Sequence, residues 1–298
     1  MKKKLITLIA GLSLVSASSF AGELTSLTSE AVLNDFDGGK EHVEWTLGKG
    51  SYKIDDTYKF TFDVDKDYIT DNSGAINPDN LGAKYQGWDT QFGLVQDLGK
   101  VKGFDVSLNY LLRYDDRWDT TSHEKAINGL TQYIVSPYFN KDLKLAGKDF
   151  SFGTELWAQV GGEDGQSLEN AAGGEVNFYL SGALSEKWNL DLSLYNWNYY
   201  SADADKYEYT VGTENTLAYN LPLKGGLSFN IDNYLYATYN TNTETDDVEI
   251  YIRPKVKYTK ELSDIKVYGA IAYEVLSYED TKTWTNNEFE LTLGFKTK

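Results

Sequence analysis

The sequence predicts an all-β fold: a transmembrane antiparallel up-and-down β-barrel with fourteen strands. The first observation behind this prediction is a long hairpin, Tyr207–Tyr239, in which apolar and polar residues alternate along both arms. Alternation with a period of two is typical of a strand, and each arm is about twice the common strand length of 5–6 residues. A strand that crosses a bilayer at a tilt needs about 9–11 residues, with apolar side chains toward lipid and polar ones toward a lumen. The hairpin therefore fits one repeat of a membrane barrel.

The second observation is the N-terminus, which has the three parts of a secretory signal. Lys2–Lys4 give a basic start, Leu5–Val15 form an apolar core, and small residues stand three and one before a cut after Ala21. The apolar core is too short to span a bilayer as a helix. We expect residues 1–21 to be a cleaved signal peptide and residues 22–298 to form a single outer-membrane β-barrel domain.

Composition narrows the classes of function. The 298 residues carry a formal net charge of -17 and no cysteine. An acidic chain is repelled by a phosphate backbone, so we expect no nucleic-acid partner. The absence of cysteine excludes a disulfide scaffold and thiol chemistry. The excess negative charge is expected in the lumen or in outer loops.

Each strand is predicted from its own alternation. Tyr58, Phe60 and Phe62, for example, alternate with polar residues. The alternation is weakest in the two segments nearest the N-terminus, Ser26–Phe36 and Glu41–Leu47. Twelve strands is the alternative, if those two segments form a periplasmic arm instead. The fourteen segments are Ser26–Phe36, Glu41–Leu47, Tyr58–Asp65, Trp88–Leu98, Phe104–Asp115, Leu130–Lys141, Asp149–Val160, Glu175–Leu184, Trp188–Tyr200, Tyr207–Leu221, Leu227–Tyr239, Val248–Lys260, Ile265–Ser277 and Phe289–Phe295.

The third observation is that short and long connections alternate. Outer-membrane barrels have short periplasmic turns and longer outer loops, and both chain ends are periplasmic only if the strand number is even. This parity favours fourteen strands over thirteen. The short connections begin at Gly99, Asp142, Ser185, Pro222 and Glu261, and the longer polar ones begin at Lys66, Asp116, Gly161, Ser201, Asn240 and Tyr278.

Three features depart from a regular barrel. Pro137 and Pro254 lie inside predicted strands and lack a ladder donor, so we expect a β-bulge at each. The chain ends after Phe295 with three polar residues, whereas such barrels commonly end in an aromatic residue.

The predicted loop Lys66–Tyr85 either folds inward as a constriction or forms a simple outer loop.

The polar faces of the strands supply candidates for lining a pore. Acidic candidates outnumber basic ones, which predicts a modest preference for cations. Arg253, Lys255 and Lys257 stand near acidic strands, so two interpretations remain open: a transverse field across the pore, or local neutralisation between adjacent strands. The candidates are Arg113, Glu155, Asp191, Glu208, Glu214, Asp232, Arg253, Lys255, Lys257, Lys266, Glu274, Glu288 and Glu290. Lys59, Asp63, Asp89 and Asp105 share the same predicted faces.

Catalysis has little support in the sequence. A barrel lipase would need a serine and a histidine together at the outer rim, and His123 beside Ser122 is a weak match. No spacing of histidine and carboxylates suits zinc, and no EF-hand loop is present. We expect no enzymatic activity, no metal and no cofactor.

The signal peptide, the alternating strands, the connection lengths and the closing run Glu288–Phe295 together resemble those of bacterial outer-membrane porins, and among these the fusobacterial major outer-membrane porin group. The resemblance covers essentially the whole mature chain. It implies a location in the outer membrane of a Gram-negative bacterium, contact with outer-membrane lipid, passive diffusion of ions and small hydrophilic solutes, and assembly as a homotrimer.

Two other hypotheses stay open at this point. The first is an outer-membrane adhesin or binding protein, whose barrel presents exposed loops carrying Trp118 and Trp284. The second is a secreted β-sandwich lectin, against which the long uniform strands argue. Channel conductance separates the first from a porin, and heat-modifiable migration on a denaturing gel separates the second.

Overall fold

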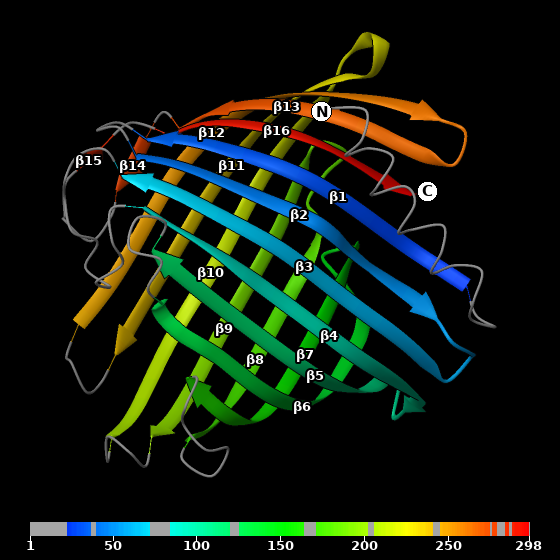
Figure 1. Ribbon diagram of the computed structural model, residues 1–298. Coiled ribbons are helices and arrows are strands. Elements are labelled where there is room, and N and C mark those ends of the chain that lie inside the picture. Colours follow the sequence, from blue (N-terminus) through cyan, green and yellow to red (C-terminus); the bar gives the residue numbers. More distant parts are fainter. Residues whose placement is uncertain are drawn as a thin grey trace.

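The computed structural model describes residues 23–36, 40–71, 84–119, 125–163, 171–201, 206–240, 245–274, 276–278, 284–285 and 288–297. Within these ranges, antiparallel strands follow one another around a single axis (Figure 1). The strands are β1 (Glu23–Phe36), β2 (Lys40–Lys53), β3 (Tyr58–Asp71), β4 (Lys84–Val101), β5 (Phe104–Asp119), β6 (Lys125–Leu145), β7 (Lys148–Glu163), β8 (Ala171–Ala183), β9 (Trp188–Ser201), β10 (Lys206–Pro222), β11 (Leu227–Asn240), β12 (Thr245–Leu262), β13 (Ile265–Tyr273), β14 (Leu276–Tyr278), β15 (Trp284–Thr285) and β16 (Glu288–Thr297).

The sheet closes on itself through β1 and β16. These two strands pair in an antiparallel register from Thr28↔Lys296 to Phe36↔Glu288, so the start of β1 and the end of β16 lie at the same end of the barrel. In Figure 1 the blue β1 runs beside the red β16. Because β14 continues β13 along β12, and β15 pairs with β14, the described residues form a closed barrel of fourteen strands.

The prediction of fourteen strands is confirmed, and the twelve-strand alternative is wrong. The two weak segments near the N-terminus are full wall strands of 14 residues each, not a separate arm. Their apolar pattern is weak because β-bulges interrupt it. The register between β1 and β2 shifts at Leu24/Ser26 and again at Thr28/Glu30, and each shift changes which residues share a face.

Several strands are longer than predicted because polar residues continue the hydrogen-bond ladder. Residues 66–71 were expected to begin a loop, but they belong to β3, where Lys66 pairs with Trp45 on one side and Trp88 on the other. The Lys66 Nζ lies 4.4 Å from the centre of the Trp88 ring. Likewise β5 continues to Asp119 and β6 begins at Lys125. The remaining part of the expected constriction loop, residues 72–83, lies outside the described residues.

One proline produces a bulge and the other does not. At Pro254 the ladder with β11 is unbroken, but on the other side Lys255 pairs with Ala272 while Ile252 pairs with Leu276. Between these two pairs the β13–β14 side has one residue more than β12, which is a bulge. At Pro137 the pairing with β7 is merely interrupted, and the same register resumes at Tyr138↔Glu155. The expected bulge at Pro137 is wrong, because a missing donor can leave a gap without inserting a residue.

Six short connections lie at the end that holds both termini of the barrel. They comprise residues 54–57, 102–103, 146–147, 184–187, 223–226 and 263–264. One of them contains the 3₁₀ turn η1 (Lys224–Gly226), the short helical element in the described residues. Within the same ranges, no helix is long and apolar enough to cross a membrane.

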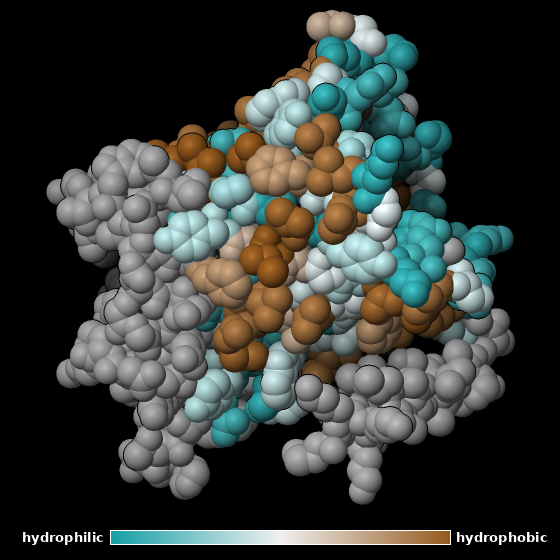
Figure 2. Space-filling model, turned by 90° about the horizontal axis from the view of Figure 1, so that it is seen from above, coloured by the Kyte–Doolittle hydropathy of each residue, from teal (hydrophilic) through white to brown (hydrophobic). Residues whose placement is uncertain are grey.

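Alternation along each strand gives the barrel an apolar outer surface. Phe92, Leu156, Ile252, Ile271 and Leu293 are 36–59% exposed, although they are large and apolar. Figure 2 shows hydrophobic residues gathered across the middle of the outer surface, with hydrophilic residues toward one end. Such a belt is what a barrel presents to lipid. The residues that alternate with it point into the interior, where small side chains such as Ala270 and Ala272 are buried.

Candidate functional site: the barrel interior

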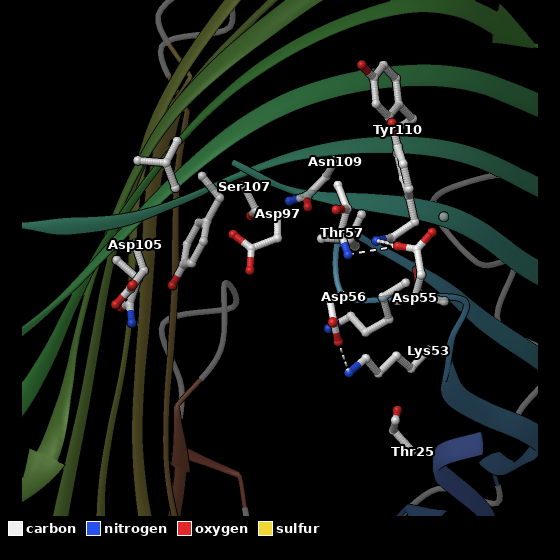
Figure 3. Close-up of a pocket in the computed structure, with 18 of the residues that line it drawn as sticks. Thr25, Lys53, Asp55, Asp56, Thr57, Asp97, Asp105, Ser107, Asn109 and Tyr110 are labelled. Atoms are coloured by element: carbon white, nitrogen blue, oxygen red, sulfur yellow. Dashed lines mark hydrogen bonds and ion pairs between the residues drawn. The ribbon is translucent and has the colours of Figure 1, made fainter. Parts of the chain in front are cut away.

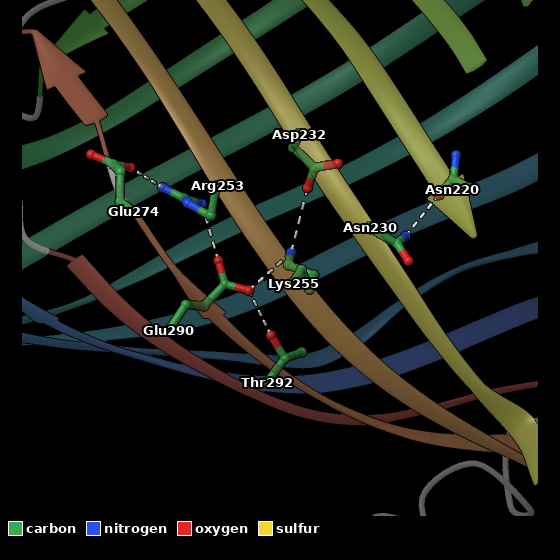
Figure 4. A network of polar contacts seen from close by, with 8 residues as sticks. All are labelled: Asn220, Asn230, Asp232, Arg253, Lys255, Glu274, Glu290 and Thr292. Carbon is green, nitrogen blue, oxygen red and sulfur yellow. Dashed lines mark hydrogen bonds and ion pairs between the residues drawn. The ribbon is translucent and has the colours of Figure 1, made fainter. Parts of the chain in front are cut away.

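A network of opposite charges covers one interior wall. We call Asp232, Arg253, Lys255, Glu274, Glu290 and Thr292 the interior ion cluster (Figure 4). They come from β11, β12, the bulge after β13, and β16, and they alternate with outward residues such as Ile252 and Val256. The side chains of Arg253, Glu274 and Glu290 are 15%, 6% and 9% exposed. These charges are thus held largely away from bulk water.

Arg253 is the centre of this cluster. Its Nη2 lies 2.8 Å from the Glu274 carboxylate, and its Nη1 lies 3.1 Å from the Glu290 carboxylate. The guanidinium also lies over the Tyr251 ring, with 4.4 Å between Cζ and the ring centre. A planar guanidinium suits this role because its forked N–H groups can serve two carboxylates at once.

Lys255 extends the cluster along β12. Its Nζ lies 3.1 Å from Glu290 Oε1 and 3.9 Å from Asp232 Oδ2. The Thr292 hydroxyl donates to the same Glu290 oxygen at 2.9 Å. The inward face of β11 itself carries no base, but the register Asp232↔Arg253 brings bases of β12 beside Asp232. For Arg253 and Lys255, the contacts are those of local neutralisation rather than of a free basic wall.

The bulge beside Pro254 positions the third carboxylate. In a regular strand, residues 272, 274 and 276 would all face the interior. With one extra residue, Ala272 and Glu274 face inward while Leu276 pairs with Ile252 on the outer side. The bulge therefore places Glu274 against Arg253 and returns the next apolar residues to the lipid side.

A second interior wall, on β7–β10, is acidic. Among the described residues, Glu155, Glu175, Asp191 and Glu214 take part in no ion pair. Their contacts are hydrogen bonds with neutral groups: Ser136 and Tyr179 donate to Glu155, Asn177 donates to Glu175 at 2.8 Å, and Tyr195 donates to Glu214 at 2.7 Å. Asp191 is an exposed interior residue. In the strand order β7 stands seven places from β16 in either direction, so Glu155 lies across the barrel from Glu290, whereas β10 with Glu214 adjoins β11 of the ion cluster.

The other predicted candidates are distributed around the interior. Arg113 Nη2 lies 3.5 Å from Asp89 Oδ2, joining β5 to β4. Lys257 Nζ lies 4.4 Å from the centre of the Tyr268 ring. Lys266 pairs with Glu261 at 3.1 Å across the short β12–β13 turn. Glu208 and Glu288 belong to β10 and β16, but their side chains lie outside the described residues, as does His123.

A cavity of about 640 Å³ opens in the interior at the short-turn end (Figure 3). Its lining mixes neutral polar residues, among them Thr61, Ser107 and Asn109 of β3 and β5, with charged residues such as Asp97 and Asp105. Lys53 and Asp56 form an ion pair of 2.6 Å at its rim. The Lys53 ammonium lowers the pKa of the Asp56 carboxyl, which lies in the turn after β2. This end of the interior can therefore hold water and hydrophilic solutes.

Sequence reasoning missed the neutral members of the interior. Ser136 and Asn177 are 0% and 1% exposed, and Tyr179 and Thr292 bind carboxylates. Only charged residues were selected as candidates. The period-two pattern could have found the neutral ones, because each shares a strand face with a selected residue or lies beside one in the sheet.

Comparisons with known proteins concern the fold alone. No protein-family model matches the chain, and no curated protein sequence matches it. The chain is similar to the solved structure of a bacterial polysaccharide outer membrane secretin, with 10% identity, a TM-score of 0.48, and coverage of 93% of this chain and 98% of that one. It is similar to an outer membrane channel from Pseudomonas putida F1, with 12% identity, a TM-score of 0.42, and coverage of 94% and 96%.

A third similar structure is the KdgM porin in complex with disordered oligogalacturonate, with 10% identity, a TM-score of 0.32, and coverage of 92% and 99%. Similarity at these values carries no argument about the function of this chain. What the structure itself shows is a closed antiparallel barrel of fourteen strands with an apolar outer belt and a charged interior, which is the architecture of outer-membrane barrels.

Proposed function

We propose that this chain is an outer-membrane porin, through which ions and small hydrophilic solutes diffuse passively, and that it performs no catalysis. The observation that carries the proposal is the division of each strand into an apolar outward face and a polar inward face around a closed barrel. A barrel of 8 strands is filled by its side chains, while one of 16 or more holds an aqueous channel. Fourteen strands leave room for a narrow channel.

We further propose a modest preference for cations. The interior ion cluster balances its own charge through pairs of 2.8–3.1 Å. Among the described residues, Glu155, Glu175 and Glu214 accept hydrogen bonds from neutral groups, so together with Asp191 they keep a net negative charge on β7–β10. Fixed charges on a pore wall raise the local concentration of counter-ions. The acidic wall on β7–β10 therefore supports selection of cations.

The reversal potential of the purified protein in a KCl gradient tests this preference. We expect a K⁺ permeability above that of Cl⁻, and we expect the double variant Asp191→Asn/Glu214→Gln to lose much of the difference. The matched control, Glu186→Gln/Asp264→Asn, removes one Asp and one Glu from exposed short turns and should change the potential little. Anion preference in the unmodified protein would contradict the proposal, and equal effects of the two variants would assign the preference to rim charge.

A further inference from the structure

Four aromatic side chains face the interior from three neighbouring strands, β7, β8 and β9. They stand among the acidic residues of the second interior wall, and we call the four the inner aromatic cluster: Trp157, Tyr179, Tyr195 and Trp197. They alternate with apolar outward residues such as Leu156, Phe178 and Leu194, which are 42%, 41% and 47% exposed. The four aromatic side chains are half-buried, so each presents part of its surface to the interior.

The strand registers place a carboxylate between the two indoles. Trp157 pairs with Glu175, and Glu175 pairs with Trp197, so the three side chains lie at one level of the sheet. The two tyrosines lie one and two inward positions nearer the short turns, and each tyrosine hydroxyl donates to a carboxylate of the same wall. Because a strand rises about 3.3 Å per residue, the inner aromatic cluster extends about 13 Å along the wall.

Asn177, at the centre of this arrangement, has hydrogen-bonding capacity left over. It stands between Glu175 and Tyr179 on the inward face of β8, pairs with Glu155 and is 1% exposed. Its Nδ2 donates to Glu175, but its buried Oδ1 has no hydrogen-bond partner among the described residues. The indole N–H of Trp157, diagonal to Asn177 across the β7–β8 ladder, is likewise buried without a partner in these ranges. The wall therefore holds one unused acceptor and one unused donor beside its aromatic rings.

This combination of groups fits a neutral sugar. A sugar ring has an apolar face of C–H groups, which packs on an aromatic ring, and a rim of hydroxyl groups, each of which both donates and accepts. Such hydroxyls can donate to the carboxylates and to Asn177 Oδ1, and can accept from the Trp157 N–H. An organic cation would suit the ring faces and the carboxylates, but it has no acceptor for the indole. An acidic sugar would be repelled by the same carboxylates.

We propose that the inner aromatic cluster binds neutral oligosaccharides as they pass through the barrel. The inference rests on the proposed porin function and names a class of solute for it. The apolar faces of the sugar pack on Trp157 and Trp197, and its hydroxyls bind Glu175 between them. A cluster of about 13 Å is longer than one sugar ring, which favours a short oligosaccharide. Because Asn177 Oδ1 and Trp157 Nε1 lie below the surface, the Trp157 indole turns when the sugar binds.

Ion current through single channels in planar bilayers provides the first test, with maltotetraose and cellotetraose as neutral probes. We expect at least one of the two sugars to interrupt the current briefly and saturably. Trp157→Leu/Trp197→Leu should raise the half-blocking concentration about tenfold or more, because both stacking surfaces are lost. Trp157→Phe/Trp197→Phe should retain more of the affinity, because it keeps two rings.

The matched control is Trp45→Leu, which removes an outward indole of β2 that is 47% exposed and should leave the blockage unchanged. Equal half-blocking concentrations for the unmodified protein and Trp157→Leu/Trp197→Leu would overturn the proposal, as would equal blockage by polyethylene glycol of the same mass. Blockage by tetraethylammonium but by neither sugar would also overturn it, and would assign the inner aromatic cluster to organic cations.

Tryptophan fluorescence tests the site without any ion current. The sugar that blocks should change the emission of the folded protein in detergent, and the change should shrink in Trp157→Phe but persist in Trp45→Phe. A barrel that conducts but shows neither blockage nor an emission change with either sugar would overturn this inference and leave the porin function standing. A barrel whose emission responds to the sugar but which gives no current steps would support the site and contradict the porin function.

Discussion

Arg253 shows how one side chain can organise an interior wall. Its two carboxylate partners, Glu274 and Glu290, are 21 and 37 residues away in the chain and are nearly buried. An ion pair removed from water must be well satisfied to persist, because desolvation of each charge costs several kcal/mol. Here the guanidinium and Lys255 serve two carboxylates, and the Thr292 hydroxyl adds a donor.

The residue-scale prediction is that Arg253→Met strongly destabilises the barrel. Two buried carboxylates would lose their strongest partner, and breaking such a pair typically costs about 3–5 kcal/mol in the free energy of unfolding. Urea unfolding in lipid vesicles measures the change. Adding Glu274→Gln to Arg253→Met should restore part of the lost free energy of unfolding.

The control for this prediction is an exposed pair. Lys144 and Asp149 lie 2.8 Å apart with side chains 74% and 81% exposed. Lys144→Met should leave the free energy of unfolding almost unchanged, because solvent screens such a pair. If Arg253→Met lowered the free energy of unfolding as little as Lys144→Met does, the ion cluster would contribute nothing to stability.

At the scale of the element, the turn between β10 and β11 depends on two glycines. Gly225 and Gly226 have φ angles of +73° and +83°, in the region that favours glycine. They differ in their surroundings. A Cβ on Gly225 would meet nothing within 4 Å, whereas one on Gly226 would run into the Thr259 carbonyl oxygen.

This difference yields the element-scale prediction. Gly225→Ala should cost about 1 kcal/mol, the ordinary penalty for a left-handed backbone with a Cβ. Gly226→Ala should cost about 3 kcal/mol or more, because it adds a backbone collision to the same penalty. Urea unfolding midpoints compare the two variants directly. Equal midpoints would mean that the turn rearranges freely and that its conformation is not fixed by β12.

The strands show how far the sequence carries a prediction. The hairpin Tyr207–Tyr239 was predicted with its two faces because its alternation is unbroken, and its register from Val211↔Tyr239 to Leu221↔Phe229 keeps apolar residues together. Strand ends were predicted poorly. Lys66 and Asp67 look like loop residues, yet main-chain hydrogen bonds do not depend on side-chain polarity.

At the scale of the whole molecule, parity and closure could be predicted, but contacts across strands could not. An even strand number followed from the alternation of short and long connections. The pairing of Arg253 with Glu274 depends on a bulge, and that of Asp232 with Lys255 depends on the register between β11 and β12. A shift of one residue in the register reverses which side chains face each other, and no local sequence pattern near Arg253 predicts such a shift.

Diffusion through the proposed porin requires a continuous aqueous path along the closed barrel. The most direct measurement is single-channel conductance of the purified full-length protein in planar lipid bilayers, using the heat-modifiable folded fraction. We expect discrete conductance steps that increase with KCl concentration. A folded, membrane-inserted barrel that produces no steps would contradict this expectation, and would leave a closed anchor for exposed loops as the function to test.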